Sequence, residues 1–218
     1  MTEDHNYSNQ STGVYGKLPK TQTDQTLFRM LKDLRKSSAK IIGVPPFAIF
    51  QDPSLEDMAL KYPISIEELQ NIHGVGEGKA KRYGRDFVAL IDAYVKENDI
   101  TRVEDLVIKS TGSNSSLKLY IIQNIDRKLP FTDISTAKGM EMNEFIKELE
   151  SIVFSGTKLN INYWVDEVLD EDQQEEIHEY FMESDTDDIE AAIEEFDGDY
   201  DDEELRLYRI KFFSEVAN

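Results

Sequence analysis

The sequence has 218 residues, no cysteine and a formal net charge of −20 at pH 7. The lack of cysteine excludes disulfides, cysteine-ligated zinc and thiol catalysis, and it is typical of the reducing cytoplasm, where we expect this protein. No apolar run approaches the length of a membrane span. With 39% hydrophobic residues, the chain can form one large or two small domains with packed cores.

The net charge is unevenly distributed along the chain. Residues 1–99 contain 13 Lys/Arg and 14 Asp/Glu, a net charge of −1, whereas residues 100–218 contain 11 and 30, a net charge of −19. Proteins that bind nucleic acids normally display clustered basic residues. The sequence therefore predicts that only the first half can meet a phosphate backbone and that the second half repels DNA.

The first half is predicted to be helical after a polar beginning. Residues 1–23 lack hydrophobic periodicity, which predicts a flexible linker. A helix is expected from Asp24, a typical N-cap residue, to the Pro45-Pro46 pair, which interrupts helical structure. Two short helices are expected next. A long helix then follows the glycine turn at residues 74–76 and runs to about Asn98.

The second half is also predicted to be helical, after a polar linker at residues 99–116. A first helix is expected from Leu117, and a helix at 141–153 takes the place of a recognition helix. The alternation from Lys158 to Trp164 predicts a strand or wing. Three amphipathic, acidic helices are expected at roughly 171–183, 186–197 and 201–215. The predicted fold is therefore all-α, with a compact helical bundle at residues 24–98 and an acidic helical domain at residues 117–218.

Several features of the first half occur together in a known domain. They are an apolar first helix and four short motifs: Val44-Pro45-Pro46-Phe47, Phe50-x-Asp52, Pro63-Ile64 and Gly74-Val75-Gly76-x-x-Lys79. Their order and spacing make residues 24–98 resemble the HRDC domain, which occurs in RecQ-type helicases and in ribonuclease D. In both, HRDC domains are helical accessory modules that often bind single-stranded nucleic acid. The resemblance implies the same fold and role here.

Residues 115–165 resemble the helix-turn-helix extension that follows the HRDC domain in some bacterial RecQ proteins. The resemblance rests on the segments SLKLYIIQNI and EMNEFIKELESIVFSGTKLNINYW. It implies that the chain is the C-terminal region of an ATP-dependent DNA helicase of repair or recombination. ATP, magnesium and zinc are then expected to bind upstream of this segment, for which we expect neither a cofactor nor catalytic activity.

A protein that binds single-stranded DNA needs positive charge along the phosphates and an aromatic ring on which bases stack. Phe47 is predicted to supply the ring, because some HRDC domains have a tyrosine after the Pro-Pro pair that contacts DNA. The predicted basic residues lie at the end of the first helix and after the glycine turn: Arg35, Lys36, Lys40, Lys79, Lys81, Arg82 and Arg85. The alternative is that Phe47 belongs to the core and that the basic residues are ordinary solvated charges.

The glycine turn resembles a phosphate-binding P-loop only superficially. Gly74 and Gly78 are separated by three residues where a P-loop has four, and Ala80 follows Lys79 where a P-loop has Ser or Thr. The turn instead predicts a helix-hairpin-helix corner, whose glycines allow close approach of another backbone. Contact of the following helix N-terminus with a phosphate is a possible additional role.

The predicted recognition helix at 141–153 carries four glutamates and only one lysine, Lys147. Base edges in the DNA grooves are usually read by Arg, Lys, Asn or Gln. The helix is therefore expected to dock a protein or to be a structural remnant. In the predicted wing, Lys158, Asn160 and Asn162 are the residues best suited to contact DNA.

No metal site or catalytic group is predicted. The acidic run at 197–204 imitates a calcium loop, but Asp202 stands where the loop needs Gly and Tyr208 where it needs Glu. A solvated acidic linker is the better interpretation. The three histidines are scattered and have no metal-ligand spacing.

These features predict an accessory region that binds single-stranded or branched DNA weakly through residues 24–98 and helps a helicase motor select its substrate. Residues 117–218 are expected to bind a basic protein partner or to limit non-specific contact with DNA. Two alternatives remain. One is a protein-interaction module without useful DNA affinity, and the other is an HRDC domain from an RNA-processing nuclease.

Overall fold

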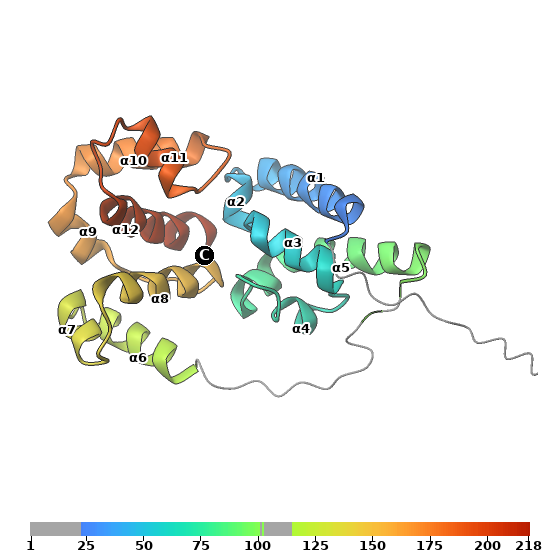
Figure 1. Ribbon diagram of the computed structural model, residues 1–218, viewed down its shortest axis with the longest axis horizontal. Helices are drawn as coiled ribbons and strands as arrows, with labels where there is room; N and C mark the ends of the chain where they lie inside the picture. The colour runs from blue at the N-terminus through green and yellow to red at the C-terminus, as the bar shows by residue number, and fades with distance from the viewer. Residues whose placement is uncertain (1–22, 101, 103–114) are drawn as a thin grey trace, which may run out of the picture.

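Two groups of helices make up the part of the chain that the computed structural model describes, residues 23–100, 102 and 115–218 (Figure 1). The N-terminal bundle comprises α1 (Gln25–Ile42), α2 (Pro46–Ile49), α3 (Asp52–Lys61), α4 (Ile66–Leu69) and α5 (Glu77–Glu97). The C-terminal bundle comprises α6 (Ser115–Asp126), α7 (Phe131–Thr136), α8 (Met142–Phe154), α9 (Asn162–Val168), α10 (Glu171–Glu183), α11 (Ile189–Glu195), α12 (Asp202–Phe212) and the π-helical turn η2 (Phe213–Ala217). The prediction of an all-α fold is confirmed.

Most of the two predicted linkers lies outside the described residues. This applies to residues 1–22 and to residues 103–114, which include the apolar patch at 106–108. Within the described ranges, no helix combines the length and the apolar character that crossing a membrane requires.

Asp24 ties the start of α1 to the rest of the N-terminal bundle. One carboxylate oxygen accepts hydrogen bonds from the amides of Thr26 and Leu27, at 3.0 and 3.2 Å, so the predicted N-cap is confirmed. The other oxygen accepts from the hydroxyls of Tyr62 and Tyr94. Burial would raise the pKa of Asp24, but these hydrogen bonds outweigh it and hold the pKa below its ordinary value.

The core of the N-terminal bundle forms where α1, α3 and α5 surround the buried ring of Phe50. This ring meets Phe87 edge-on, with 4.9 Å between the centroids. A Cβ atom at Gly84 would lie 2.4 Å from a methyl carbon of Leu69, so the glycine that weakens α5 as a helix former also lets α4 pack closely on it. The elements that carry the predicted DNA contacts are thus held in one rigid unit.

In the C-terminal bundle, α12 packs against α8, α9, α10 and α11 (Figure 1). At the opposite side of α8, the rings of Phe131 and Trp164 stack with 4.8 Å between their centroids and 11° between their planes. The helices α6, α7 and α8 form the part of the bundle that corresponds to the predicted helix-turn-helix extension.

The predicted strand or wing at Lys158 to Trp164 is wrong. Residues 157–161 have no regular structure, and α9 begins at Asn162. The buried side chains explain the difference: Leu159 and Ile161 alternate as in a strand, but Ile161 and Val165 are one helical turn apart. The carbonyl of Ile161 accepts the hydrogen bond that starts the helix, from the amide of Val165.

A buried ion network joins α8 to α12. The Glu150 carboxylate accepts two hydrogen bonds from Arg206, at 3.0 and 2.8 Å, and one from Arg209 at 2.6 Å. Burial would raise the pKa of Glu150, but the hydrogen bonds from Arg206 and the charge of Arg209 hold it below its ordinary value. Of the four glutamates of the predicted recognition helix, Glu150 is therefore buried and structural.

The acidic run at 197–204 also has a structural role. The Asp201 carboxylate accepts from the amide of Glu204, and the Glu204 carboxylate accepts from the amide of Asp201, which makes a capping box for α12. Tyr200 is buried and donates to Glu176 at 2.6 Å. The predicted acidic linker is therefore partly built into the C-terminal bundle.

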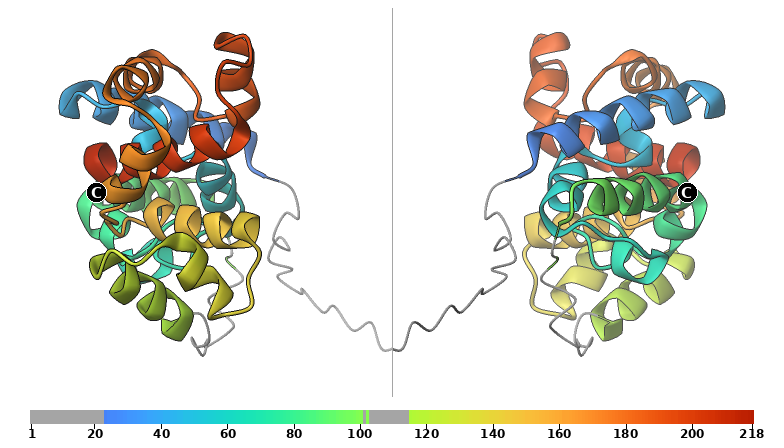
Figure 2. Two further views of the ribbon diagram at one scale, coloured as in Figure 1. Left: turned by 90° about the vertical axis from the view of Figure 1, so that its left-hand side faces the viewer. Right: turned by 90° about the vertical axis from the view of Figure 1, so that its right-hand side faces the viewer.

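The two bundles are in direct contact. Phe47 and Ala48 of α2 belong to the apolar core of the C-terminal bundle, and α2 packs on η2. Figure 1 shows the C-terminus of the chain at the boundary between the two bundles, and Figure 2 shows it from the two ends of the molecule. The predicted nucleic-acid face of α2 and α5 is therefore the face on which the C-terminal bundle docks.

We predict that Glu150→Gln destabilises the protein by about 3–5 kcal/mol, because it leaves Arg206 and Arg209 buried without their carboxylate. Urea unfolding at neutral pH measures the loss. The wild-type stabilisation should disappear as the pH falls below 4.5 through the lowered pKa of Glu150. Glu148→Gln, on the same helix, is the control and should change stability by less than about 0.5 kcal/mol. An equal loss in both variants would contradict the assignment.

Candidate nucleic-acid interface

The exposed basic residues of α1 form a stripe along the helix. Lys36 and Lys40, both predicted, are exposed. Arg29 and Lys32 lie on the same face, since the spacings are three and four residues, and Lys32 also pairs with Asp52. Ile41, at the end of the stripe, is 86% exposed. The stripe offers positive charge at regular intervals, as binding along a phosphate backbone requires.

Arg35 is a structural residue rather than part of the exposed stripe. It is 6% exposed, and its guanidinium donates to the Phe50 carbonyl at 2.6 Å and pairs with Asp52 at 2.7 Å. These contacts fix α1 to the turn between α2 and α3. An arginine committed to two partners in the bundle has little capacity left for a phosphate.

Phe47 lies between the bundles and presents no face to solvent. Its side chain is 3% exposed, and its ring lies 6.2 Å from that of Phe212 and 5.8 Å from that of Phe213. In this arrangement no base can stack on it. Phe47 is therefore a core residue, as the alternative prediction had it. The core that it joins is that of the C-terminal bundle.

The glycine corner, residues 74–78 before and at the start of α5, is covered by the turn that ends α8. The amide of Gly76, the N-cap residue of α5, donates to the Ser155 carbonyl at 2.8 Å. A Cβ at Gly76 would lie 2.4 Å from that oxygen, and one at Gly78 would lie 2.3 Å from the Gly156 carbonyl oxygen. The predicted close backbone approach is confirmed, and the approaching backbone is that of the C-terminal bundle.

Lys79 is the most deeply buried of the predicted contacts, with 1% exposure. Its ammonium lies 5.0 Å from the centroid of the Phe213 ring. Burial lowers the pKa of Lys79 to about 7, although the charge of Asp187 opposes this shift, and the nearby Arg82 adds to it. Docking of the two bundles therefore takes a positive charge out of water.

The other basic residues of α5 lie at the edge of the contact. Arg82 is exposed, yet it donates to the Ala217 carbonyl at 2.8 Å, and the Tyr83 hydroxyl donates to the same oxygen at 3.0 Å. Lys81 is exposed and pairs with Glu77. Arg85 is exposed. Of the eight predicted residues, the structure thus leaves five on the surface and buries Arg35, Phe47 and Lys79.

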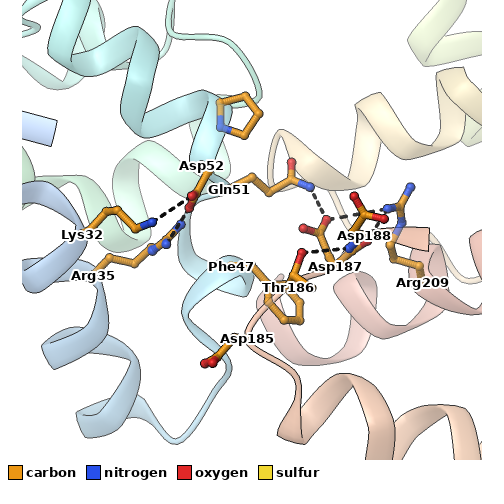
Figure 3. A pocket seen from close by; sticks show the side chains of 11 residues that line it. Lys32, Arg35, Phe47, Gln51, Asp52, Asp185, Thr186, Asp187, Asp188 and Arg209 are labelled. Atoms are coloured by element: carbon orange, nitrogen blue, oxygen red, sulfur yellow. Dashed lines mark hydrogen bonds and ion pairs between the residues drawn. The ribbon is translucent and has the colours of Figure 1, made fainter. Parts of the chain in front are cut away.

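A cleft of about 370 Å³ opens between the bundles beside Phe47 (Figure 3). On one wall, Lys32 and Arg35 both pair with Asp52, whose pKa stays below its ordinary value because these contacts outweigh its burial. Across the cleft, Gln51 donates to Asp187, and Arg209 donates to the carbonyl of the same residue. The basic groups of this cleft are therefore matched by acceptors of the protein itself.

The predicted contacts of the C-terminal bundle do not converge on a basic surface. Lys158 and Asn160 are exposed, and Asn162 starts α9. Lys147 is exposed on α8. Among the residues that the structure describes, no group of three or more His, Asp or Glu side chains is arranged to hold a metal ion.

Two family models match the chain. The HRDC domain model matches residues 24–91, and the model of the RecQ-1-like helix-turn-helix domain matches residues 115–165. The chain carries an HRDC domain followed by a RecQ-1-like helix-turn-helix domain. This pair identifies the segment as one of the kind found in the C-terminal region of RecQ helicases, as the resemblance predicted.

Similar curated proteins are DNA helicases. The ATP-dependent DNA helicase RecQ of Bacillus subtilis is 44% identical over 79 residues, which is 36% of this chain and 13% of the relative. The corresponding protein of Haemophilus influenzae is 41% identical over 71 residues, 33% of this chain and 12% of the relative. An ATP-dependent DNA helicase of Schizosaccharomyces pombe is 32% identical over 74 residues, 33% of this chain and 6% of the relative. The chain thus matches only about an eighth or less of these relatives.

The sequence reasoning missed the residues that cover the HRDC face. These residues are Phe212, Phe213 and Ala217, and they come from the end of the acidic half, where an amphipathic, acidic helix was expected. One signal was available. The segment from Leu205 to Phe213 contains apolar and basic residues and no acidic one, unlike the acidic helices that precede it.

We predict that Lys79→Met stabilises the chain at pH 7 by about 1–4 kcal/mol, the range found when buried charges are replaced by apolar groups. The folded-state pKa is about 7 and lies below the ordinary 10.5. Between these values the unfolded chain binds more protons, so wild-type stability should rise with pH and the variant should lack this rise. Urea unfolding across this range tests both points, with Lys81→Met as the exposed control. A less stable Lys79→Met variant that keeps the rise would contradict the assignment.

Proposed function

We propose that this chain is an accessory nucleic-acid-binding region of a RecQ-type ATP-dependent DNA helicase, which helps the motor select single-stranded or branched DNA in repair or recombination. The observation that carries the proposal is the HRDC domain at residues 24–91, together with the similarity over 71 to 79 residues to DNA helicases of two bacteria and a yeast. The motor itself, with its ATP, magnesium and zinc sites, is assigned to other parts of such a helicase.

The exposed basic residues support a modest electrostatic grip. Lys36 and Lys40 on α1, with Lys81, Arg82 and Arg85 on α5, are accessible in the structure. Residues 1–99 are nevertheless close to neutral. A few phosphate contacts next to an acidic bundle favour weak binding of DNA. Weak binding suits a module that influences which substrate is chosen, while the helicase motor supplies most of the affinity for DNA.

The C-terminal bundle offers a second surface, for which we propose a basic protein segment as partner. A groove of about 540 Å³ between α10 and α11 is lined by Tyr180 and Phe196 and by glutamates, Glu176, Glu179, Glu183 and Glu195. Carboxylates beside aromatic rings attract Lys and Arg side chains both by charge and by cation–π contact. This surface is separate from the one that meets DNA in the proposal above.

We predict that the full chain binds a labelled oligothymidine with a log K that falls with log salt at a slope of roughly −2 to −4, as expected for three to five phosphate contacts. Lys36→Gln together with Lys40→Gln removes two contacts and should lower the slope by about 1.4 in magnitude. Lys128→Gln with Lys147→Gln makes the same charge change on the C-terminal bundle and should leave the slope unchanged. Anisotropy that stays flat at low salt for the wild-type chain would reject the DNA-binding role.

For the groove, we predict that Glu179→Gln with Glu183→Gln weakens binding of an oligolysine peptide several-fold. Glu144→Gln with Glu148→Gln on α8 removes the same charge elsewhere and is the control. Isothermal titration of both variants measures the effect. An equal loss in both pairs would show attraction by net charge alone, without a docking groove.

A further inference from the structure

We propose that the C-terminal bundle is a built-in competitor of single-stranded nucleic acid: it occupies the nucleic-acid face of the HRDC domain with groups that imitate a bound strand, and it must move away for that face to act. The inference rests on the proposed function, because it assigns to the HRDC domain the DNA-binding role argued above. It goes further by naming a second, covered contact surface and the element that covers it.

The aromatic part of the imitation is at Phe47. A base stacked on this ring would lie parallel to it. Instead, the rings of Phe212 and Phe213 pack against Phe47 with centroids at 6.2 and 5.8 Å, tilted by 38° and 45°. They come from the junction of α12 and η2 and bury the ring almost completely. The stacking position of the HRDC domain is therefore filled by side chains of the same protein.

The phosphate part of the imitation is at the start of α5. Amides at a helix N-terminus bind anions, and the Gly76 amide here donates to the Ser155 carbonyl. Ser155 is the C-cap residue of α8, and the helix dipole places partial negative charge at this end of the helix. The Ala217 carbonyl takes a second such position, as acceptor for Arg82 and Tyr83. Backbone oxygens thus stand where phosphate oxygens of a strand would be bound.

Unfavourable features are concentrated in this contact. Lys79 gives up hydration when the bundles dock. Among the described residues, the buried side-chain atoms without a hydrogen-bond partner are Arg35 Nε, Arg209 Nε and Asn218 Oδ1. Two of these residues line the interbundle cleft, and Asn218 follows the turn η2 that packs on α2. Separation of the bundles would return Lys79 to water, so the docked state is poised to open when a ligand competes for the HRDC face.

The acidic composition of the C-terminal bundle fits this role. A strand that approaches Phe47 must pass the loop with Asp185, Asp187 and Asp188, which borders the cleft (Figure 3). Opening therefore removes two obstacles together, the physical cover and a cluster of like charge. DNA binding in the docked state is restricted to the exposed basic stripe of α1 and the outer edge of α5.

Two glycines allow a sharp test on the full chain. Gly78→Ala places a favourable residue in the first turn of α5, but its Cβ would meet the Gly156 carbonyl oxygen at 2.3 Å. Gly76→Ala keeps an extended backbone that alanine accepts, with φ −98°, and meets the Ser155 carbonyl oxygen at 2.4 Å. Both substitutions are compatible with the N-terminal bundle and clash only with the other one. Ala89→Ser, on the exposed side of α5, is the control.

Two readouts separate the opening from its consequence. Acetylation of Lys79, followed by mass spectrometry, reports exposure of the covered face without DNA. Anisotropy with a labelled oligothymidine reports affinity. We expect both glycine variants to label Lys79 faster than wild type and to bind about tenfold more tightly, as expected when the competent state is rare in wild type. Phe47→Leu added to Gly78→Ala should reverse much of the gain, because it keeps an apolar side chain but removes the stacking ring.

The outcomes distinguish the two proposals. Faster labelling with unchanged affinity would overturn the competitor role and leave the proposed function in place. Unchanged labelling in both variants would also overturn it, because the bundles would then absorb the clash without separating. Faster labelling with no DNA binding by any variant, wild type included, would remove the proposed function itself.

Discussion

The structure depends on one backbone contact, the meeting of the glycine corner before α5 with the turn that ends α8. The Gly76 amide donates to the Ser155 carbonyl, and the two backbones approach so closely that a Cβ atom at Gly76, Gly78 or Gly156 would collide with the facing chain. Because the corner fixes this approach, α2 comes to lie under η2 and Phe47 enters the core of the C-terminal bundle. Burial of Lys79 follows from the same geometry.

The negative charge of the C-terminal bundle is not spread evenly over its surface. The C-terminal bundle contributes most of the net charge of −20, yet its helix α12 carries Arg206, Arg209 and Lys211. Arg206 and Arg209 neutralise Glu150, while Lys211 donates to Gln174 at 2.6 Å. Its negative charge is therefore concentrated on outer faces such as the groove between α10 and α11. Apolar rings and carbonyl oxygens, rather than carboxylates alone, make the inner face compatible with the HRDC domain.

The sequence was sufficient for features that depend on neighbouring residues. Caps such as Asp24, the breaks at the Pro45-Pro46 pair and the spacing of apolar residues predicted the helices of both halves and the close approach at the glycine corner. The predicted wing failed because Ile161 serves two periodicities, alternating with Leu159 and lying one turn before Val165. A local pattern of this kind cannot decide whether a short apolar segment forms a strand or begins a helix.

The site itself was only partly predictable, because exposure is a property of packing between distant segments. Lys36 and Lys40 were predicted and are exposed, and Arg29 and Lys32 could have been found by the same helical spacing. Lys79 lies beside the buried stripe of α5, but nothing near it in sequence indicates that Phe213 covers it. A neighbour so far along the chain has no signature in local periodicity.

Hydrogen exchange of the wild-type chain, with and without a saturating oligothymidine, tests the central claim most directly. DNA bound to the HRDC face should accelerate amide exchange in the Ser155–Gly156 turn and in residues 213–217, since separation of the bundles exposes these covered segments to water. Exchange in α12 away from the contact should stay unchanged. Binding of DNA with undiminished protection of both segments would contradict the account.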